Sequence, residues 1–222
     1  ILFSIVLVAV QLGLYMGARK MITSMIERAD GDIWVMAYGT KNFEEAQPIS
    51  GREKYAALST PGVANAIPLI ASFTDWKKPS GVSTLAVIIG SDIEDGGLAP
   101  WDIVDGDLAA LNTRDAVVID RTYLAELDVK GIGDTAQVRQ SRVRISALTE
   151  GIRSFTVTPF VFTTLNRARS VLNMPSDMIT YVLVKLQPGA DAITVRDKLR
   201  KKVPDGEVLT KAEFRQRSLN HW

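Results

Sequence analysis

The first sixteen residues, Ile1 to Met16, constrain the fold more than any other stretch of the chain. They carry no charge, and ten of them are Ile, Leu, Val or Phe. On the membrane-insertion scale such side chains contribute about −0.3 to −0.6 kcal/mol each, so ten contribute about −3 to −6 kcal/mol. Sixteen helical residues cover roughly 24 Å, and a full span needs about 20 residues. Because the chain starts at Ile1, we expect residues 1–16 to be the end of a transmembrane helix, anchored by Leu2, Phe3, Ile5, Val6, Leu7 and Val8.

Two other interpretations of this apolar stretch are open. A secretory signal peptide has a shorter apolar region that follows positive charge, and no such charge precedes Ile1 in this sequence. A buried core helix of this length normally has a polar face, which residues 1–16 lack. The transmembrane interpretation is therefore favoured.

Beyond Met16 the helical pattern continues as a stalk. Met21, Ile22, Met25 and Ile26 recur at three- and four-residue steps, which predicts one apolar face and one wet face through Ala29. The pair Arg19 and Lys20 would place this flank in the cytoplasm by the positive-inside rule, but the rule weakens when a long domain follows. These residues leave the side of the membrane open.

Composition excludes several classes of function. The net charge is +1 and the basic residues are scattered, which argues against binding to nucleic acid. The absence of cysteine excludes thiol catalysis, disulfides and thiolate metal sites. The only histidine, His221, lies second from the end, too isolated to predict a hydrolase triad or a zinc site.

Two phosphate- or cation-binding patterns also fail. The chain has no G-x-x-x-x-G-K-[ST] cradle for a nucleoside triphosphate. The acidic stretch from Asp92 to Gly97 begins like a calcium loop, but Gly96 stands at position five, where an acid is required, and no glutamate stands at position twelve. We interpret it as a turn, and we expect no catalytic residue, no metal and no cofactor.

Two β-α-β units predict the fold class. The first has a strand over 32–38, a helix capped by Ser50 and Glu53 and ended by Pro61-Gly62, and a strand over 63–76 with Pro68 at an edge or a bulge. The second has a strand over 180–186, a helix capped by Asp191, and a strand over 207–210. Together they predict an α+β fold with split, ferredoxin-like β-α-β repeats.

A β-rich subdomain is expected between the two halves. Strands over 85–89, 116–119 and 142–148 and a short helix over 121–127 fall between residues 85 and 158. The predicted divisions are therefore the end of a transmembrane helix (1–16), a stalk with the first half of the main subdomain (17–84), the insertion (85–158), the second half (159–210) and a last helix (211–222).

The last helix is predicted to lead into a second membrane span. Thr210 and Glu213 have capping-box spacing, Phe214 and Leu219 are its apolar positions, and Trp222 suits a membrane interface. With Met21, Ile22, Met25 and Ile26 of the stalk, Phe214 and Leu219 are our candidate coupling residues. Five further aromatic residues are predicted as core more often than as partner contacts: Trp76, Trp101, Phe155, Phe160 and Phe162.

The order of these parts resembles a known family. After the apolar end come Asp32-Ile-Trp-Val-Met36, Pro48-Ile49, Pro61-Gly62-Val63, Asp75-Trp76-Lys77, Leu186-Gln-Pro-Gly189 and Val208-Leu-Thr-Lys-Ala-Glu-Phe214. This series of individually weak motifs resembles the extracytoplasmic domain of MacB-like ABC transporter permeases, of the FtsX superfamily, closest to the DevC branch. It covers essentially the whole chain.

The resemblance implies a periplasmic domain of an inner-membrane subunit with four spans. In this family a ferredoxin-like "porter" part carries an inserted "sabre" part. Family members dimerise, work with an ABC ATPase, and commonly pair with a HlyD-like adaptor protein that leads to an outer-membrane channel. The family's domain has no catalytic residues to carry over.

Three hypotheses about function follow. The first is an export subunit whose periplasmic domain couples ATP-driven helix motion to periplasmic movement and adaptor docking. The second is a membrane-tethered domain that senses a ligand in a groove between subdomains. The third, an anchored periplasmic enzyme, is the weakest because no residue pattern supplies the chemistry.

Overall fold

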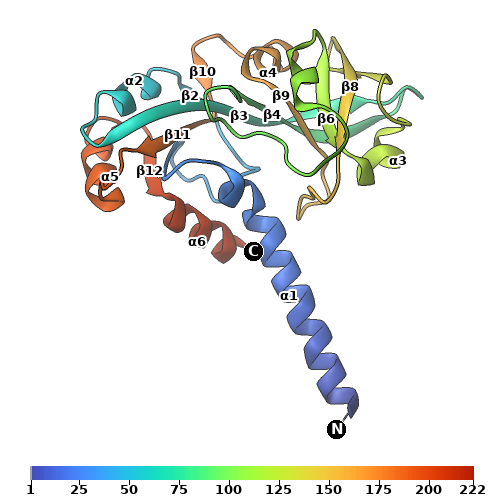
Figure 1. Cartoon of the computed structure of the whole chain (residues 1–222), viewed down its shortest axis with the longest axis horizontal. Coiled ribbons are helices and arrows are strands. Elements are labelled where there is room, and N and C mark those ends of the chain that lie inside the picture. The colour runs from blue at the N-terminus through green and yellow to red at the C-terminus, as the bar shows by residue number, and fades with distance from the viewer. Residues whose placement is uncertain (1) are drawn as a thin grey trace.

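The computed structural model describes residues 2–222, with side chains from Phe3 onward; Ile1 and the side chain of Leu2 lie outside the described residues. A long helix leaves a body built on one curved sheet, and the last helix ends beside it (Figure 1). The helices are α1 (Leu2–Arg28), α2 (Glu53–Leu58), α3 (Leu124–Leu127), α4 (Leu165–Leu172), α5 (Ala192–Arg200) and α6 (Lys211–His221), with 3-10 turns at Leu108–Asn112 and Arg121–Tyr123.

The strands form one large mixed sheet and one small antiparallel pair. Their bounds are β1 (Ile33–Met36), β2 (Ile49–Ser50), β3 (Val63–Lys77), β4 (Ser83–Ser91), β5 (Ile103–Gly106), β6 (Ala116–Asp120), β7 (Thr135–Val138), β8 (Ser141–Thr149), β9 (Phe160–Thr164), β10 (Met178–Ile179), β11 (Tyr181–Leu186) and β12 (Glu207–Thr210). The large sheet has the order β12-β1-β11-β3-β4-β9-β6-β8-β5, and β7 pairs with β3 and β8.

One end of this sheet confirms the predicted ferredoxin-like pattern. The four strands β12, β1, β11 and β3 are antiparallel neighbours, and α2 and α5 are the crossover helices between β1 and β3 and between β11 and β12. The strand order is that of two interleaved β-α-β units. The predicted α+β class is therefore confirmed.

The long strand β3 joins this end to the rest of the sheet. Its first half pairs with β11, and its second half pairs with β4 and then with β7. Pro68 pairs with Val182 of β11, and the pairing with β4 begins only at Leu69. Pro68 therefore lies on a locally open edge, where its missing N–H is harmless, as the sequence predicted.

The remaining strands pair across long sequence separations. β9 lies between β4, to which it is parallel, and β6, to which it is antiparallel, and β8 is parallel to β6. The strands predicted over 85–89, 116–119 and 142–148 are confirmed as parts of β4, β6 and β8. The burial of β8 alternates over its first half, as its charged and apolar residues predict.

Alternation along the strands divides the core into two layers. Ile33 and Val35 of β1 pack on the face that α2, α4 and α5 cover, whereas Trp34 and Met36 pack on the opposite face. In ferredoxin-like units that opposite face needs its own cover. Here α6, the end of α1 and the segment between β1 and β2 provide it (Figure 1).

One predicted helix cap is wrong. Ser50 lies in β2, and α2 begins three residues later after Arg52, which makes no side-chain cap hydrogen bond. The Ser50 hydroxyl instead accepts a hydrogen bond from the Arg52 amide at 3.2 Å. Pairing of β2 with β10 holds Ser50 in a strand, which prevents the helix from starting there.

Candidate functional site: the junction of the terminal helices

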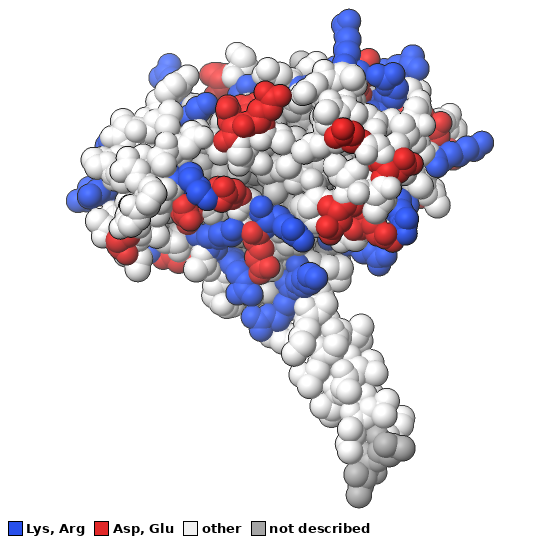
Figure 2. All heavy atoms as spheres, viewed as in Figure 1, with Lys and Arg blue, Asp and Glu red and all other residues white. Residues whose placement is uncertain are grey.

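Residues 3–17 of α1 are exposed and lie outside the body. Phe3, Ile5, Val6, Leu7 and Val8 are all exposed, and Phe3–Arg28 is long and apolar enough to cross a membrane. Figure 2 shows this part of the helix without Lys, Arg, Asp or Glu. An apolar helix that buries nothing within the body fits the anchoring role predicted from the sequence, and that role stays a prediction.

The second half of α1 turns one face toward the body. Met25 and Ile26 are almost completely buried, and Met21 and Ile22 are half-buried. This face packs against α6 and joins the core layer that contains Trp34 and Phe214. The predicted stalk therefore has the apolar face that its spacing indicates.

The last helix begins with the capping box that the sequence predicts. The Thr210 hydroxyl accepts from the Glu213 amide at 3.2 Å, and the Glu213 carboxylate accepts from the Thr210 amide at 2.8 Å. Arg196 of α5 forms an ion pair with Glu213. The start of α6 is thus fixed to its own strand and to α5.

Phe214 anchors α6 in an aromatic cluster. Its ring is fully buried, with centroids 5.2 Å from Trp34 and 6.0 Å from Tyr181. Phe43 stacks on Tyr181 at 5.6 Å, and the Tyr181 hydroxyl donates to the Phe43 carbonyl at 3.0 Å. Since Trp34 is on β1 and Tyr181 on β11, α6 packs directly on two strands of the ferredoxin-like end of the sheet.

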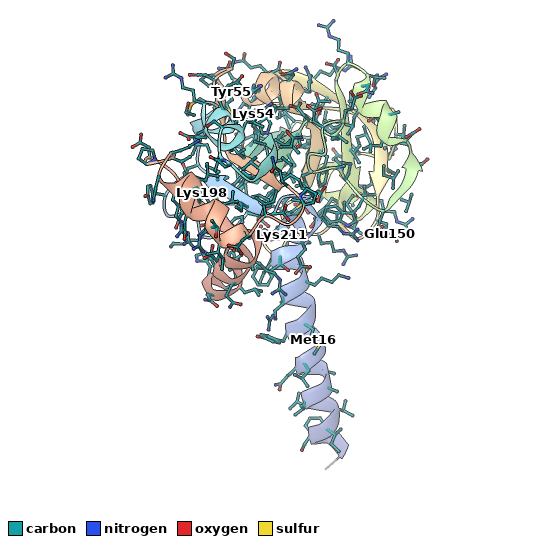
Figure 3. All side chains as sticks on the ribbon, turned by 60° about the vertical axis from the view of Figure 1, so that its left-hand side comes forward. Met16, Lys54, Tyr55, Glu150, Lys198 and Lys211 are labelled. Carbon is teal, nitrogen blue, oxygen red and sulfur yellow. The ribbon has the colours of Figure 1, made fainter. Side chains whose placement is uncertain are left out.

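Two cations of α6 hold the end of α1. Lys211 Nζ donates to the carbonyls of Glu27 and Ala29 at 2.9 and 2.8 Å, which satisfies carbonyls at the helix end. Arg215 Nε lies 2.7 Å from Glu27 Oε1, and the same carboxylate accepts from the Thr23 hydroxyl at 2.8 Å. Figure 3 shows Lys211 beside α1. The sequence analysis missed these contacts, because they join residues more than 180 positions apart.

A third cation of α6 ties the helix to the sheet edge. Arg217 Nη1 lies 2.6 Å from Glu207 Oε2 on β12, and both side chains are partly buried. The hydrogen bond from Arg217 lowers the pKa of the Glu207 carboxyl despite the opposing effect of burial. Each Lys and Arg of α6 therefore has a partner on α1, just after it, or on the sheet.

The segment 150–159, between β8 and β9, meets the junction from the other part of the sheet. Glu44 accepts hydrogen bonds from the hydroxyls of Ser154 and Thr156 at 2.7 and 2.6 Å. Burial raises the pKa of the Glu44 carboxyl, although these two hydrogen bonds oppose the shift. The Phe155 ring lies 5.1 Å from the Trp222 ring at the end of α6.

The other predicted residues divide between core and surface. Trp76, Phe160 and Phe162 are buried, whereas Trp101 and Phe155 are half-buried. Leu219 is half-buried on α6, and Trp222 is half-exposed against Phe155. The junction thus brings together Met25, Ile26, Phe214 and Trp222 among the predicted residues, and it adds Lys211, Arg215, Glu27 and Glu44, which the sequence analysis did not select.

An open groove of about 850 Å³ lies elsewhere, where β4 and β9 end and α4 begins. Asp92, Glu94 and Asp95 line one part, and Arg167, which pairs with Asp115 at 2.9 Å, lines another. The stretch from Asp92 forms turns, in which the backbone amides of Asp95 and Gly97 donate hydrogen bonds to the Asp92 carbonyl. Within residues 2–222 no three His, Cys, Asp or Glu side chains lie close enough to hold a metal ion.

The model of one protein family, described as the MacB-like periplasmic core domain, matches residues 1–202. No curated protein sequence matches the chain. Among solved structures, the periplasmic region of MacB from Actinobacillus actinomycetemcomitans matches with a TM-score of 0.59 at 11% identity, over 88% of this chain and 96% of that one. The extracellular domain of the noncanonic ABC-type transporter YknZ from Gram-positive bacteria matches with a TM-score of 0.54 at 10% identity, over 81% and 99%. The structural matches show the shared fold, and the family match over most of the sequence shows membership: this chain belongs to the MacB-like periplasmic core domains, the periplasmic domains of MacB-type ABC transporter permeases.

Proposed function

We propose that this domain transmits motion between the membrane helices of an export permease and the periplasmic body. One observation carries the proposal: α1 and α6 are fixed to each other and to the same core layer at the membrane-proximal junction. Lys211 and Arg215 hold the end of α1, while Met25, Ile26 and Phe214 share the layer beneath the sheet. A displacement of α1 therefore moves α6 with it.

The contacts of the segment 150–159 extend this path. Ser154 and Thr156 bind Glu44, and Phe155 contacts Trp222, so the junction touches the loop that connects β8 and β9. Packed contacts and buried hydrogen bonds resist small displacements more than exposed loops do. We infer that motion of the terminal helices reaches both ends of the large sheet.

The experiment uses cysteine pairs in the intact transporter, because the chain has no cysteine of its own. Glu27→Cys with Arg215→Cys places two thiols across the α1–α6 contact, where the native side chains lie 2.7 Å apart. Asp75→Cys with Leu85→Cys, cross-strand partners of β3 and β4, is the matched control. Because α1 and α6 are proposed to move together, a short bismaleimide should crosslink the first pair, like the control pair, with the same yield with and without ATP. A yield for the first pair that falls when ATP is added, while the control yield stays constant, would show that α6 does not follow α1 and would contradict the proposal.

Partners of this unit follow from the family resemblance. We propose an ABC ATPase that drives the cycle, a HlyD-like adaptor with an outer-membrane channel, a homodimeric permease, and placement in the bacterial inner membrane. Purification of the intact permease with its neighbours, followed by mass spectrometry of the copurified proteins, tests each of these. If no ATPase copurifies, the proposed ATP-driven cycle is refuted.

The groove at the ends of β4 and β9 favours a second candidate function, ligand sensing. It is large enough for a small molecule, and it presents carboxylates together with Arg114 and Arg167. Burial raises the pKa of the Asp92 carboxyl at its wall. A thermal-shift screen should reveal a ligand that raises the midpoint by several degrees, and the shift should disappear in Arg167→Gln if the groove is the site.

A further inference from the structure

The charges of this chain are distributed unevenly. From Tyr15 to Arg28 and from Lys211 to Trp222 there are six Lys and Arg residues and two Glu residues, a net charge of +4, although the whole chain carries only +1. Figure 2 shows Lys and Arg side chains gathered where α1 meets the body. The basic end of the molecule is therefore the end from which the apolar helix leaves.

Pairing within the protein accounts for half of these cations. Lys211, Arg215 and Arg217 of α6 bind carbonyls or carboxylates. By contrast Arg19, Lys20 and Arg28 of α1 have no carboxylate within 4 Å among the described residues. The fold uses the α6 cations structurally and leaves the α1 cations unneutralised.

The positions of two of the three α1 cations fit a membrane surface. Arg19 and Lys20 come directly after the exposed apolar turns that end at Gly17. Helical geometry places Lys20 almost opposite the body-facing side formed by Ile22 and Ile26, so its ammonium points away from the body. Arg28 lies about two turns farther along α1, at the level of the body, where its guanidinium is 5.2 Å from the Trp101 ring centroid. Arg28 therefore has a contact in the body. Lys20 is exposed, whereas Arg19 is half-buried near the body-facing side of α1, where its guanidinium contacts Tyr15 of the same helix.

Aromatic side chains occur at the same level as Arg19. The Arg19 guanidinium donates to the Tyr15 hydroxyl at 3.1 Å and lies 5.4 Å from the Tyr15 ring centroid. Trp222 is half-exposed at the end of α6, which Figure 1 shows beside α1. Tyr and Trp next to Arg and Lys are typical of the region of phospholipid head groups.

We infer that Arg19 and Lys20 form a binding surface for the phosphates of anionic phospholipids, which holds the body at a fixed height and tilt on the bilayer. This inference rests on the membrane placement of α1 and does not require transport. It also explains why two cations follow the apolar segment on the periplasmic side, where the positive-inside rule does not predict them.

The test reconstitutes the full chain in nanodiscs that contain neutral and anionic phospholipids, then ejects it for native mass spectrometry and counts the lipids that remain bound. The wild type should retain anionic lipid at a ratio severalfold above that of the disc. Arg19→Gln with Lys20→Gln should lower this enrichment by about fivefold or more, since one cation near a charged surface is already worth about that factor. High salt during reconstitution should weaken the enrichment as well.

The matched control removes the same charge elsewhere. Lys54→Gln with Lys198→Gln neutralises two cations of α2 and α5; Figure 3 shows Lys54 on the far side of the body from α1. This variant should keep the wild-type enrichment. A wild-type ratio equal to that of the disc, or equal losses in both double variants, would overturn the inference.

Insertion of α1 is measured separately. A Cβ added at Gly13 meets no heavy atom within 4 Å, so Gly13→Cys introduces a thiol without a clash. Protection of this thiol from a water-soluble maleimide reports membrane placement. Protection without anionic enrichment refutes the lipid inference alone, and accessibility of the thiol refutes both it and the anchoring role.

Discussion

Replacement of Phe214 by alanine tests whether α6 is part of the core or an appendage. The ring is fully buried against Trp34 and Tyr181, and the same layer contains Met25 and Ile26 of α1. Truncation of a buried phenylalanine destabilises proteins by about 3–5 kcal/mol, and two lost ring contacts favour the upper part of that range. A domain of this size has a free energy of unfolding of about 5–15 kcal/mol, so this loss is a large fraction of the total.

The assay is thermal unfolding of the full chain in a mild detergent, followed by near-ultraviolet circular dichroism. At roughly 2–4 °C per kcal/mol for a domain of this length, Phe214→Ala should lower the midpoint by about 6–20 °C. Leucine fills part of the space of the ring, so the midpoint of Phe214→Leu should lie between those of the wild type and Phe214→Ala. Tyr55→Ala is the control, because Tyr55 is 69% exposed on α2 and its ring packs little surface. A difference of about 2 °C corresponds to less than about 1 kcal/mol. If the midpoint of Phe214→Ala lies within about 2 °C of the Tyr55→Ala midpoint, the claim that α6 is part of the core is refuted.

Three further predictions concern polar contacts. Lys211→Met should destabilise the chain by about 1 kcal/mol and speed amide hydrogen exchange over residues 25–29, because the carbonyls at the end of α1 lose their donor; unchanged exchange would contradict this. Burial raises the pKa of Glu44 in the folded state, so protonation of this carboxyl favours folding. Glu44→Gln should therefore be more stable than the wild type at pH 7, by a margin that shrinks as the pH falls through the raised pKa. Urea unfolding of both proteins at pH 7 and at a pH below the raised pKa measures this margin. Asp120 is 2% exposed and accepts four hydrogen bonds. Asp120→Ala should therefore lower the free energy of unfolding by about 3 kcal/mol, and Asp120→Asn should lower it less. Equal urea midpoints for the two variants would contradict the hydrogen-bond explanation.

Local signals made much of the ferredoxin-like end predictable. Apolar runs bounded by turn residues located β1 and β11, and the capping box at Thr210 located the start of α6. Such signals depend only on neighbouring residues, and the structure keeps them. The failed cap at Ser50 shows the limit, because the two-residue pairing of β2 with β10 overrides a local preference.

One missed helix had a local signal that sequence reasoning could have used. α4 buries Leu165, Ala168, Val171 and Leu172, which recur at helical spacing. Thr164 caps its start by accepting from the Arg167 amide, and Asn173 ends it in the left-handed conformation. Gly90 of β4 lies beneath this helix, where a Cβ would fall 2.2 Å from that of Ala168.

The junction could be predicted only in part, because its contacts are tertiary. The apolar stripe of Met25 and Ile26 and the position of Phe214 could be read from periodicity, but not that they would share one layer. The contact of Glu44 with Ser154 and Thr156 joins residues 110 and 112 positions apart. No local pattern distinguishes such a glutamate from a solvated one, so the polar contacts of the junction could not be predicted from the sequence.

The distribution of burial and charge along α1 connects the two proposals. The segment that contacts the body, around Met25 and Ile26, is buried and clamped by α6. Just below it, Arg19 and Lys20 have no carboxylate partner in the part of the chain that the structure describes. If the cations hold lipid phosphates, they fix a pivot at the membrane surface, and the clamped segment above them becomes a short, stiff lever. A tilt of the membrane helix would then displace α6 and the sheet instead of being absorbed by a flexible linker. Loss of the cations should therefore preserve folding but lower ATP-dependent transport by the intact transporter, whereas loss of Phe214 should impair both folding and transport.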